Sequence, residues 1–219
     1  IIISSSNVSL DLNGFTIHRS STAAASGGAI KLIGAEIRNV TIKNGNITSA
    51  PLNGTGVNPS GRGFFNGIEF STGFGAEVEP SNILVSQVLV YGGASRGIYL
   101  SSNSGSSNIV THGSVRKTGS TGISADEVHF SSAIDCGGDG IWTRNLVSHS
   151  IGKSIGNSYG IFCNGPVSDS IGTSVTGTGI YGSVVSNSSG SGSKSIEASI
   201  AVACKTFGTQ VITNKYNMP

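Results

Sequence analysis

The stretch that decides the fold is residues 140–180, which read GIWTRNLVSHSIGKSIGNSYGIFCNGPVSDSIGTSVTGTGI. A Gly-Ile step stands at its start, near its middle and at its end, and the residues between the steps are rich in turn-forming Gly, Ser, Asn and Asp. A fixed period of about 20 residues is typical of stacked structural repeats. It is too short for a strand, a helix and a return, so we predict an all-β repeat.

The repeat extends in both directions from this stretch. Its isoleucines are Ile30, Ile68, Ile98, Ile123, Ile141, Ile161 and Ile180, with a weaker return at Ile196, and the intervals from Ile98 to Ile180 are 25, 18, 20 and 19 residues. A second apolar position precedes the next isoleucine by 13 or 14 residues, at Val85, Val110, Val128, Val147 and Val167. Polar, Gly-rich insertions lengthen the early intervals. We predict one parallel β-helix domain over residues 1–219, with coils of about 18–25 residues and loop insertions in the early coils.

The composition is typical of a folded β protein and excludes several classes of function. The chain has 33 Gly and only 11% charged residues, while β-branched Ile and Val recur at short intervals, as they do not in a disordered tract. The net charge of +2 is small, which gives no electrostatic footprint for nucleic acid or an anionic membrane. No apolar run is long enough to span a bilayer. We expect neither nucleic acid nor a membrane as a partner.

The cysteines and the first residues lead to two further expectations. Cys136, Cys163 and Cys204 show no metal-type pairing, so we expect them to be small buried side chains, with at least one unpaired within the chain. The chain enters directly on a strand-like segment, and its three leading isoleucines are too few for a signal-peptide core. We expect a native N-terminal cap or signal peptide to be missing.

Three segments resemble a known family. They are residues 7–17 (NVSLDLNGFTI), 137–141 (GGDGI) and 159–165 (YGIFCNG), and they are similar to the bacterial right-handed parallel β-helix repeat proteins of the pectate-lyase-like superfamily. The resemblance covers nearly the whole chain and implies the fold and its right-handedness. It is not specific for an activity, because this fold carries lyases, hydrolases, epimerases and binding proteins.

Alternation along each strand assigns the residues after the isoleucine to an inner and an outer column. The inner column, two residues after the isoleucine, is apolar or small throughout: Leu32, Phe70, Leu100, Ala125, Thr143, Cys163 and Gly182. The outer column, one residue after it, is Lys31, Glu69, Tyr99, Ser124, Trp142, Phe162 and Tyr181. Four of these seven are aromatic in a chain with 6% aromatic residues. We expect them to stand on rungs about 4.8 Å apart.

This aromatic column has two interpretations. Tyr99, Trp142, Phe162 and Tyr181 could form a platform on which sugar rings stack, which makes them the candidate substrate-binding residues. Alternatively, the column could be a subunit interface, for example in a trimer, or could be covered by a loop.

Charged residues near the column are the candidates for chemistry. Asp126 and Arg144, three residues after their isoleucines, should face out on successive rungs, as a cross-strand ion pair or as a substrate-facing charge pair beside Trp142. Asp139 is the best second carboxyl group, but its offset of five strand positions corresponds to about 16 Å. Glycosidases need about 5–9.5 Å between the two carboxyl groups, so this pair fits only if a corner folds the two together. Signatures of polygalacturonases are absent from the sequence.

A second charged pair, His149 and Asp169, shares a column two residues after the valine position. The pair could tune a general base, but no motif places a nucleophile beside it, and a structural ladder is the alternative. Strict alternation points this column inward unless a corner intervenes.

Three hypotheses follow for function: a secreted or cell-surface β-helix that binds or processes a polysaccharide, a structural or oligomeric β-helix without activity, and a degenerate lyase or hydrolase. We expect no cofactor. Calcium enters by the resemblance alone, since the sequence has no cluster of acidic residues that would supply its six to eight oxygen ligands. Enzymatic activity, as a lyase or glycoside hydrolase, likewise rests on the resemblance.

Overall fold

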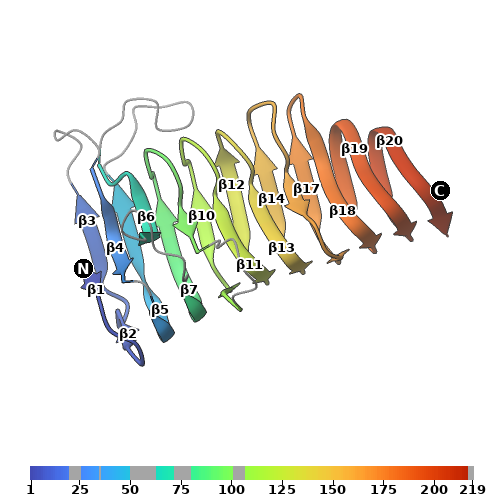
Figure 1. The fold of residues 1–219 in the computed structure, drawn as a ribbon. Coiled ribbons are helices and arrows are strands. Elements are labelled where there is room, and N and C mark those ends of the chain that lie inside the picture. The colour runs from blue at the N-terminus through green and yellow to red at the C-terminus, as the bar shows by residue number, and fades with distance from the viewer. Residues whose placement is uncertain (20–25, 35, 50–62, 72–79, 101–106, 217–219) are drawn as a thin grey trace.

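The computed structural model describes residues 1–19, 26–34, 36–49, 63–71, 80–100 and 107–216. These residues are all-β, without a helix, and every strand pair whose register is defined is parallel. Figure 1 shows the strands stacked side by side in chain order from the N-terminus to the C-terminus. The arrangement is consistent with the parallel β-helix that the repeat predicts. In the described ranges, no helix is long and apolar enough to cross a membrane.

Twenty strands make up the stack: β1 (Ile2–Ile3), β2 (Ser9–Asp11), β3 (Thr16–Arg19), β4 (Gly28–Ile33), β5 (Arg38–Ser49), β6 (Asn66–Ser71), β7 (Ser81–Tyr91), β8 (Ile98–Tyr99), β9 (Ile109–Thr111), β10 (Ser114–Arg116), β11 (Ile123–His129), β12 (Ser132–Cys136), β13 (Ile141–Ser148), β14 (Ile151–Ser154), β15 (Ile161–Cys163), β16 (Val167–Ser168), β17 (Ile171–Ser174), β18 (Thr178–Ser186), β19 (Ser189–Val202) and β20 (Lys205–Tyr216). Longer strands such as β13 pair along two lines, first with β15 and then with β16.

The pairings trace three strips along the stack. The first strip links β4, β6, β8, β11, β13, β15, β18 and β19. The second links β2, β5, β7, β9 and the later parts of β11, β13, β18 and β19, with β16 between β13 and β18. The third links β3, the later parts of β5 and β7, and then β10, β12, β14, β17 and the start of β19.

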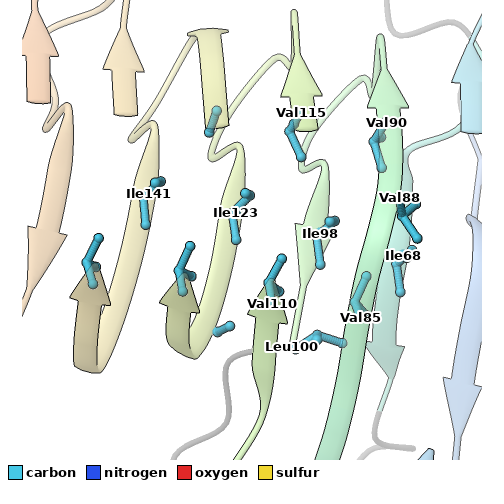
Figure 2. Packing of buried hydrophobic residues seen from close by; sticks show 14 of the residues in the cluster. Ile68, Val85, Val88, Val90, Ile98, Leu100, Val110, Val115, Ile123 and Ile141 are labelled. Carbon is cyan, nitrogen blue, oxygen red and sulfur yellow. The ribbon is translucent and has the colours of Figure 1, made fainter. Parts of the chain in front are cut away.

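The predicted columns are confirmed by the register. Each repeat isoleucine pairs with the next one, from Ile30 and Ile68 through to Ile180 and Ile196, and all of them are 0% exposed. The valines of the second strip pair in the same way and are equally buried. Figure 2 shows Ile68, Ile98, Ile123 and Ile141 in one row, with Val85 and Val110 nearby. Burial of such side chains stabilises the fold by about 1.5–3 kcal/mol each.

Close backbone packing explains why glycine precedes the isoleucine. A Cβ atom on Gly160 would lie 2.2 Å from the backbone nitrogen of Thr173 on the third strip. On the third strip itself, a Cβ atom on Gly172 would lie 2.3 Å from the carbonyl oxygen of Gly179. Both distances are shorter than any real contact of a Cβ atom. In these late rungs the first and third strips therefore approach each other backbone to backbone, and glycine is required on both sides, whereas in earlier rungs Val90, Val115 and Ala133 occupy the third-strip position.

The corner between the second and third strips has one repeated conformation. Its column is left-handed, with positive φ at every member: Asn44, Gln87, His112, Phe130, His149, Asp169, Asn187 and Ala203. His149 and Asp169 belong to this corner and are exposed, so the corner overrides the strict alternation that would have pointed them inward. Their closest side-chain nitrogen and oxygen atoms are 3.9 Å apart.

A ladder of buried serines follows the corner directly. Ser131, Ser150, Ser170 and Ser188 are each at most 4% exposed, and each hydroxyl donates to the carbonyl oxygen two residues before it. Each of these hydroxyls also accepts the backbone N–H of the equivalent residue one rung earlier, as Ser150 does from Ser131. Both groups that the corner would leave unpaired are thus satisfied inside the stack.

All three cysteines are buried, as predicted, and all three are free. Burial raises the pKa of the Cys136 thiol to about 12, and it also raises the pKa values of Cys163 and Cys204. A thiol with a raised pKa carries little of the reactive thiolate at neutral pH. The cysteines therefore act as small core side chains.

Candidate functional site

The predicted outer column lies on the first strip in the predicted order. The register joins Lys31, Glu69, Tyr99, Ser124, Trp142, Phe162 and Tyr181, and continues to Glu197 on β19 and Val211 on β20. The aromatic residues are only partly exposed. Ser124, which is 4% exposed, separates Tyr99 from the other three. The contiguous aromatic surface therefore consists of Trp142, Phe162 and Tyr181, which we call the strand ladder.

The rings of the strand ladder lie face to face. The centroids of Trp142 and Phe162 are 5.9 Å apart with an interplanar angle of 9°, and those of Phe162 and Tyr181 are 4.8 Å apart with an angle of 6°. Both faces of the Phe162 ring are therefore covered by its neighbours. Since sugar stacking uses a ring face, the ladder is not the continuous platform that the sequence suggested. Its free faces are at its two ends.

Further groups cover the ladder and Tyr99. Tyr159 packs edge-on against both Phe162 and Tyr181, with centroid distances of 5.0 and 5.9 Å. The guanidinium carbon of Arg144 is 5.9 Å from the ring centroid of Trp142. Arg96 covers Tyr99 in the same manner, at 3.9 Å. Cations at such distances are attracted to the ring faces. The face of Tyr181 that points away from Phe162 adjoins the next rung, where Glu197 occupies the same column.

The predicted position of Asp126 is wrong. Asp126 is 0% exposed, and its Oδ2 accepts the backbone N–H of Asn108 at 2.9 Å. The cause is an irregularity in the pairing of β11 with β13: Ala125 pairs with Thr143, but Glu127 pairs with Leu146, so β13 holds one extra residue here. Asp126 therefore does not face solvent, as the alternation predicted it would.

Asp139 lies just before the start of β13. Its Oδ1 accepts the hydroxyl of Ser158 and the backbone N–H of Tyr159, the latter at 3.0 Å. Asp139 thus stabilises the turn that enters the next rung. Because Asp126 is 0% exposed, the two carboxyl groups do not share a solvent-facing surface.

A concave site lies where the strand ladder ends, and the sequence reasoning missed it. It has a volume of about 400 Å³, and its aromatic and polar lining residues are Asn164, Tyr181, Ser183, Glu197, Ser199 and Thr213. We call it the Tyr181 groove. The residue after the weaker repeat at Ile196 is Glu197, so continuing the outer column by one rung would have found the carboxylate.

Glu197 is the acidic group of this groove. Its Oε2 is 3.2 Å from Nζ of Lys194, whose side chain is 48% exposed. The carboxylate is therefore held in place by a surface ion pair, which contributes little to stability but fixes an acceptor beside the Tyr181 ring. An aromatic face next to a carboxylate, amides and hydroxyls can bind a sugar, whose C–H face is apolar and whose hydroxyls are donors and acceptors.

The part of the chain that the structure describes contains no set of donor side chains for a metal ion. There, His, Cys, Asp and Glu side chains form no group of three or more that could hold a metal ion. The calcium that the family resemblance implies therefore gains no support from these residues.

Comparisons of the chain with models of known families, with curated proteins and with solved structures found no match.

Proposed function

We propose that the chain forms a right-handed parallel β-helix of the pectate-lyase-like type, placed outside the cell, and that it binds a polysaccharide in the Tyr181 groove. The observation that carries this proposal is the position of Tyr181. Its ring is the last of the strand ladder, and the same ring lines a groove with Glu197 and four further polar side chains.

The geometry favours binding without cleavage. Glycosidic hydrolysis generally needs two carboxyl groups about 5–9.5 Å apart on either side of the bond. Asp126 is buried against Asn108, and Asp139 is held in a turn by Ser158 and Tyr159. Glu197 is the acid of the groove, and a single carboxylate beside a lysine suits recognition of hydroxyl groups.

Affinity electrophoresis in gels that contain soluble polysaccharides tests the proposal. Retardation of the wild-type chain is expected in at least one neutral or acidic polysaccharide, and Tyr181→Ala should weaken it about tenfold, or about 1.4 kcal/mol. The matched control is Phe130→Ala, which removes an exposed ring from the corner column. The proposal fails if no polysaccharide retards the chain, or if Tyr181→Ala and Phe130→Ala bind equally well.

Trp142→Ala separates the groove from the whole column. If the groove is the site, Trp142→Ala retains most of the affinity, because two rungs separate Trp142 from Tyr181. Equal losses from the two variants would favour the column as the binding surface. Release of reducing or unsaturated ends from the bound polysaccharide would show cleavage, and Asp126, Arg144 and Asp139 would then be the first residues to replace.

A second candidate function is structural, as a subunit interface. It is favoured by the strand ladder itself, since rings that cover one another's faces form a rigid, partly exposed apolar ridge. Light scattering after size exclusion tests this candidate. A monomeric mass at high protein concentration, unchanged in Trp142→Ala, would remove it.

A further inference from the structure

A cluster at the start of the first strip joins three groups that can react with one another. Nζ of Lys31 on β4 is 3.0 Å from Oε1 of Glu69 on β6. The other carboxylate oxygen, Oε2, accepts a short hydrogen bond from Nδ2 of Asn66. Asn66 is 6% and Glu69 8% exposed, although Glu69 occupies the column that the sequence assigns to solvent. One nearly buried carboxylate therefore contacts an amine on one side and a carboxamide on the other.

The backbone is built to hold this carboxylate. The Glu69 side chain folds back over Gly28, where a Cβ atom would lie only 2.8 Å from its Cγ. The backbone N–H of Gly28 donates to Oε1 at 3.1 Å. Asn66 pairs with Gly28 in the register, and Lys31 pairs with Glu69, so Asn66 lies three positions before Glu69 on β6 and Lys31 lies opposite Glu69 on β4. The absence of a side chain at Gly28 is what allows Glu69 to reach Asn66.

The carboxamide of Asn66 is fixed at its oxygen as well. Its Oδ1 accepts the backbone N–H of Arg96 at 3.0 Å. A donor aimed at a carbonyl oxygen stabilises the negative charge that develops there when a nucleophile attacks the carbon. Glu69 contacts both Lys31 and Asn66, so it positions the two reactants and can carry a proton between them.

We propose that Lys31 and Asn66 are joined by an isopeptide bond that the folded chain forms on its own. Glu69 takes a proton from the Lys31 ammonium group, and the free amine attacks Cγ of Asn66, whose oxygen is stabilised by the Arg96 N–H. Glu69 then passes the proton to Nδ2. The Cγ–Nδ2 bond breaks, the second proton of the attacking nitrogen passes through Glu69 to the departing ammonia, which leaves as ammonium, and an amide links Nζ of Lys31 to Cγ of Asn66. No oxidant, reductant or cofactor takes part, and Glu69 ends as it began.

At this position, the bond would hold two of the early rungs together. The interval from Ile30 to Ile68 is the longest between successive repeat isoleucines. A covalent link between β4 and β6 closes this interval, and cross-links across long loops restrict the unfolded chain most. The bond would join the two rungs where the chain between them is longest.

The chain contains a matched control for the proposal. Lys43, Asp11 and Asn44 repeat the same three functional groups, with Asp in place of Glu: Lys43 Nζ is 3.5 Å from Oδ2 of Asp11, and Asn44 Nδ2 is 3.3 Å from Oδ1. This cluster is exposed, with side-chain exposures of 43% for Lys43 and 45% for Asp11. Water competes for every group in it, so we expect Lys43 and Asn44 to stay unlinked.

Intact-mass and tandem mass spectrometry of the folded chain test the proposal. The wild-type mass should be lower than the sequence mass by one ammonia, and a digest should contain one branched peptide with residues 31 and 66. Glu69→Gln should restore the full mass, because the amide cannot accept the proton from Lys31. The wild-type measurement needs no variant, so a variant that fails to fold does not obscure the result.

Lys31→Arg distinguishes the bond from the one reaction that mimics it. Asn66 precedes Gly67, and a succinimide formed at such a step also loses ammonia, but it does not need Lys31. Lys31→Arg should therefore have the full mass and a lower melting temperature than the wild type. A wild-type chain at full mass, or a mass deficit that persists in Lys31→Arg, would show that the cluster is an ordinary ion pair with hydrogen bonds and would overturn the proposal.

Discussion

Two stacks of rings in this molecule look alike and arise differently. The strand ladder places Trp142, Phe162 and Tyr181 on β13, β15 and β18, with centroids 5.9 and 4.8 Å apart. The corner stack of His112, Phe130 and His149 has centroids 5.2 and 4.7 Å apart. The backbone differs, since Phe162 belongs to a strand, whereas Phe130 has φ +46° and is 52% exposed.

The comparison teaches that stacking here follows from the register. Parallel in-register rungs bring equivalent residues about 4.8 Å apart, so planar side chains at any repeated position will stack, whether or not a ligand is bound. A stack alone is therefore no sign of a binding site. Both stacks border concave sites. The strand ladder ends in a ring, Tyr181, that lines its groove beside Glu197, whereas the corner stack is followed by Asp169, whose Oδ2 is 3.9 Å from His149 Nε2 and whose concave site of about 370 Å³ has no aromatic lining residue.

The largest expected effect comes from the core that supports the strand ladder. Ile161, directly before Phe162, is 0% exposed between Ile141 and Ile180. Ile161→Ala should lower the free energy of unfolding by about 2–5 kcal/mol, because the rigid rungs leave a cavity. Urea denaturation followed by circular dichroism measures it. Ile171→Ala, which truncates a 48% exposed isoleucine of the third strip, is the control and should change stability by at most about 0.5 kcal/mol.

If the two isoleucine variants lost equal stability, the isoleucine column would not be the core that supports the strand ladder. The corner stack has no such column directly behind it, since the residue that follows Phe130 is a ladder serine.

The next effect tests what supports the corner. Ser150→Ala removes the acceptor of the Ser131 N–H and leaves that buried donor unpaired. A buried donor without a partner costs about 1–3 kcal/mol. The control Ser132→Ala removes only a partly buried hydroxyl bonded to Ser114 at 3.3 Å, and should cost less than about 1 kcal/mol. Hydrogen exchange should also show faster exchange of the Ser131 amide in Ser150→Ala alone. Unchanged protection of that amide would contradict the structural role of the serine ladder.

The strips could be predicted from the sequence because their signal is periodic. Every isoleucine from Ile30 to Ile180 lies in the predicted register, since an error of one residue would expose the whole inner column. The burial of the cysteines was also predicted, from the absence of any metal-type pairing among them.

The corners and the Tyr181 groove could not be predicted from the periodic pattern, because the alternation of inward and outward residues fails where the chain bends. Asp126 and Glu69 were both assigned to solvent and are both buried, one at an irregular pairing and the other folded over Gly28. His149 and Asp169 face solvent because their corner is left-handed. Tyr181 was found as an aromatic of the outer column, but the groove beside it depends on Glu197 and β20, where the repeat is weakest.

The smallest expected effect is that of Phe130→Asn in the corner stack. Asn is well suited to positive φ, and Asn44 and Asn187 already occupy the corner column at φ 59° and 47°. Phe130→Asn relieves a left-handed conformation that costs a bulky residue about 1–2 kcal/mol. It also loses two stacking contacts of about 0.5–1.5 kcal/mol each, so the net change should stay within about 1 kcal/mol of zero.

Phe162→Asn gains no such relief, because Phe162 is already in a strand, where Asn is disfavoured. It loses a partly buried ring and both of its stacking partners, and should lower the free energy of unfolding by about 1.5–3 kcal/mol. Urea denaturation of the two variants side by side measures the difference. If Phe130→Asn proved as destabilising as Phe162→Asn, the corner stack would contribute as much as the strand ladder, and backbone strain would not distinguish the two.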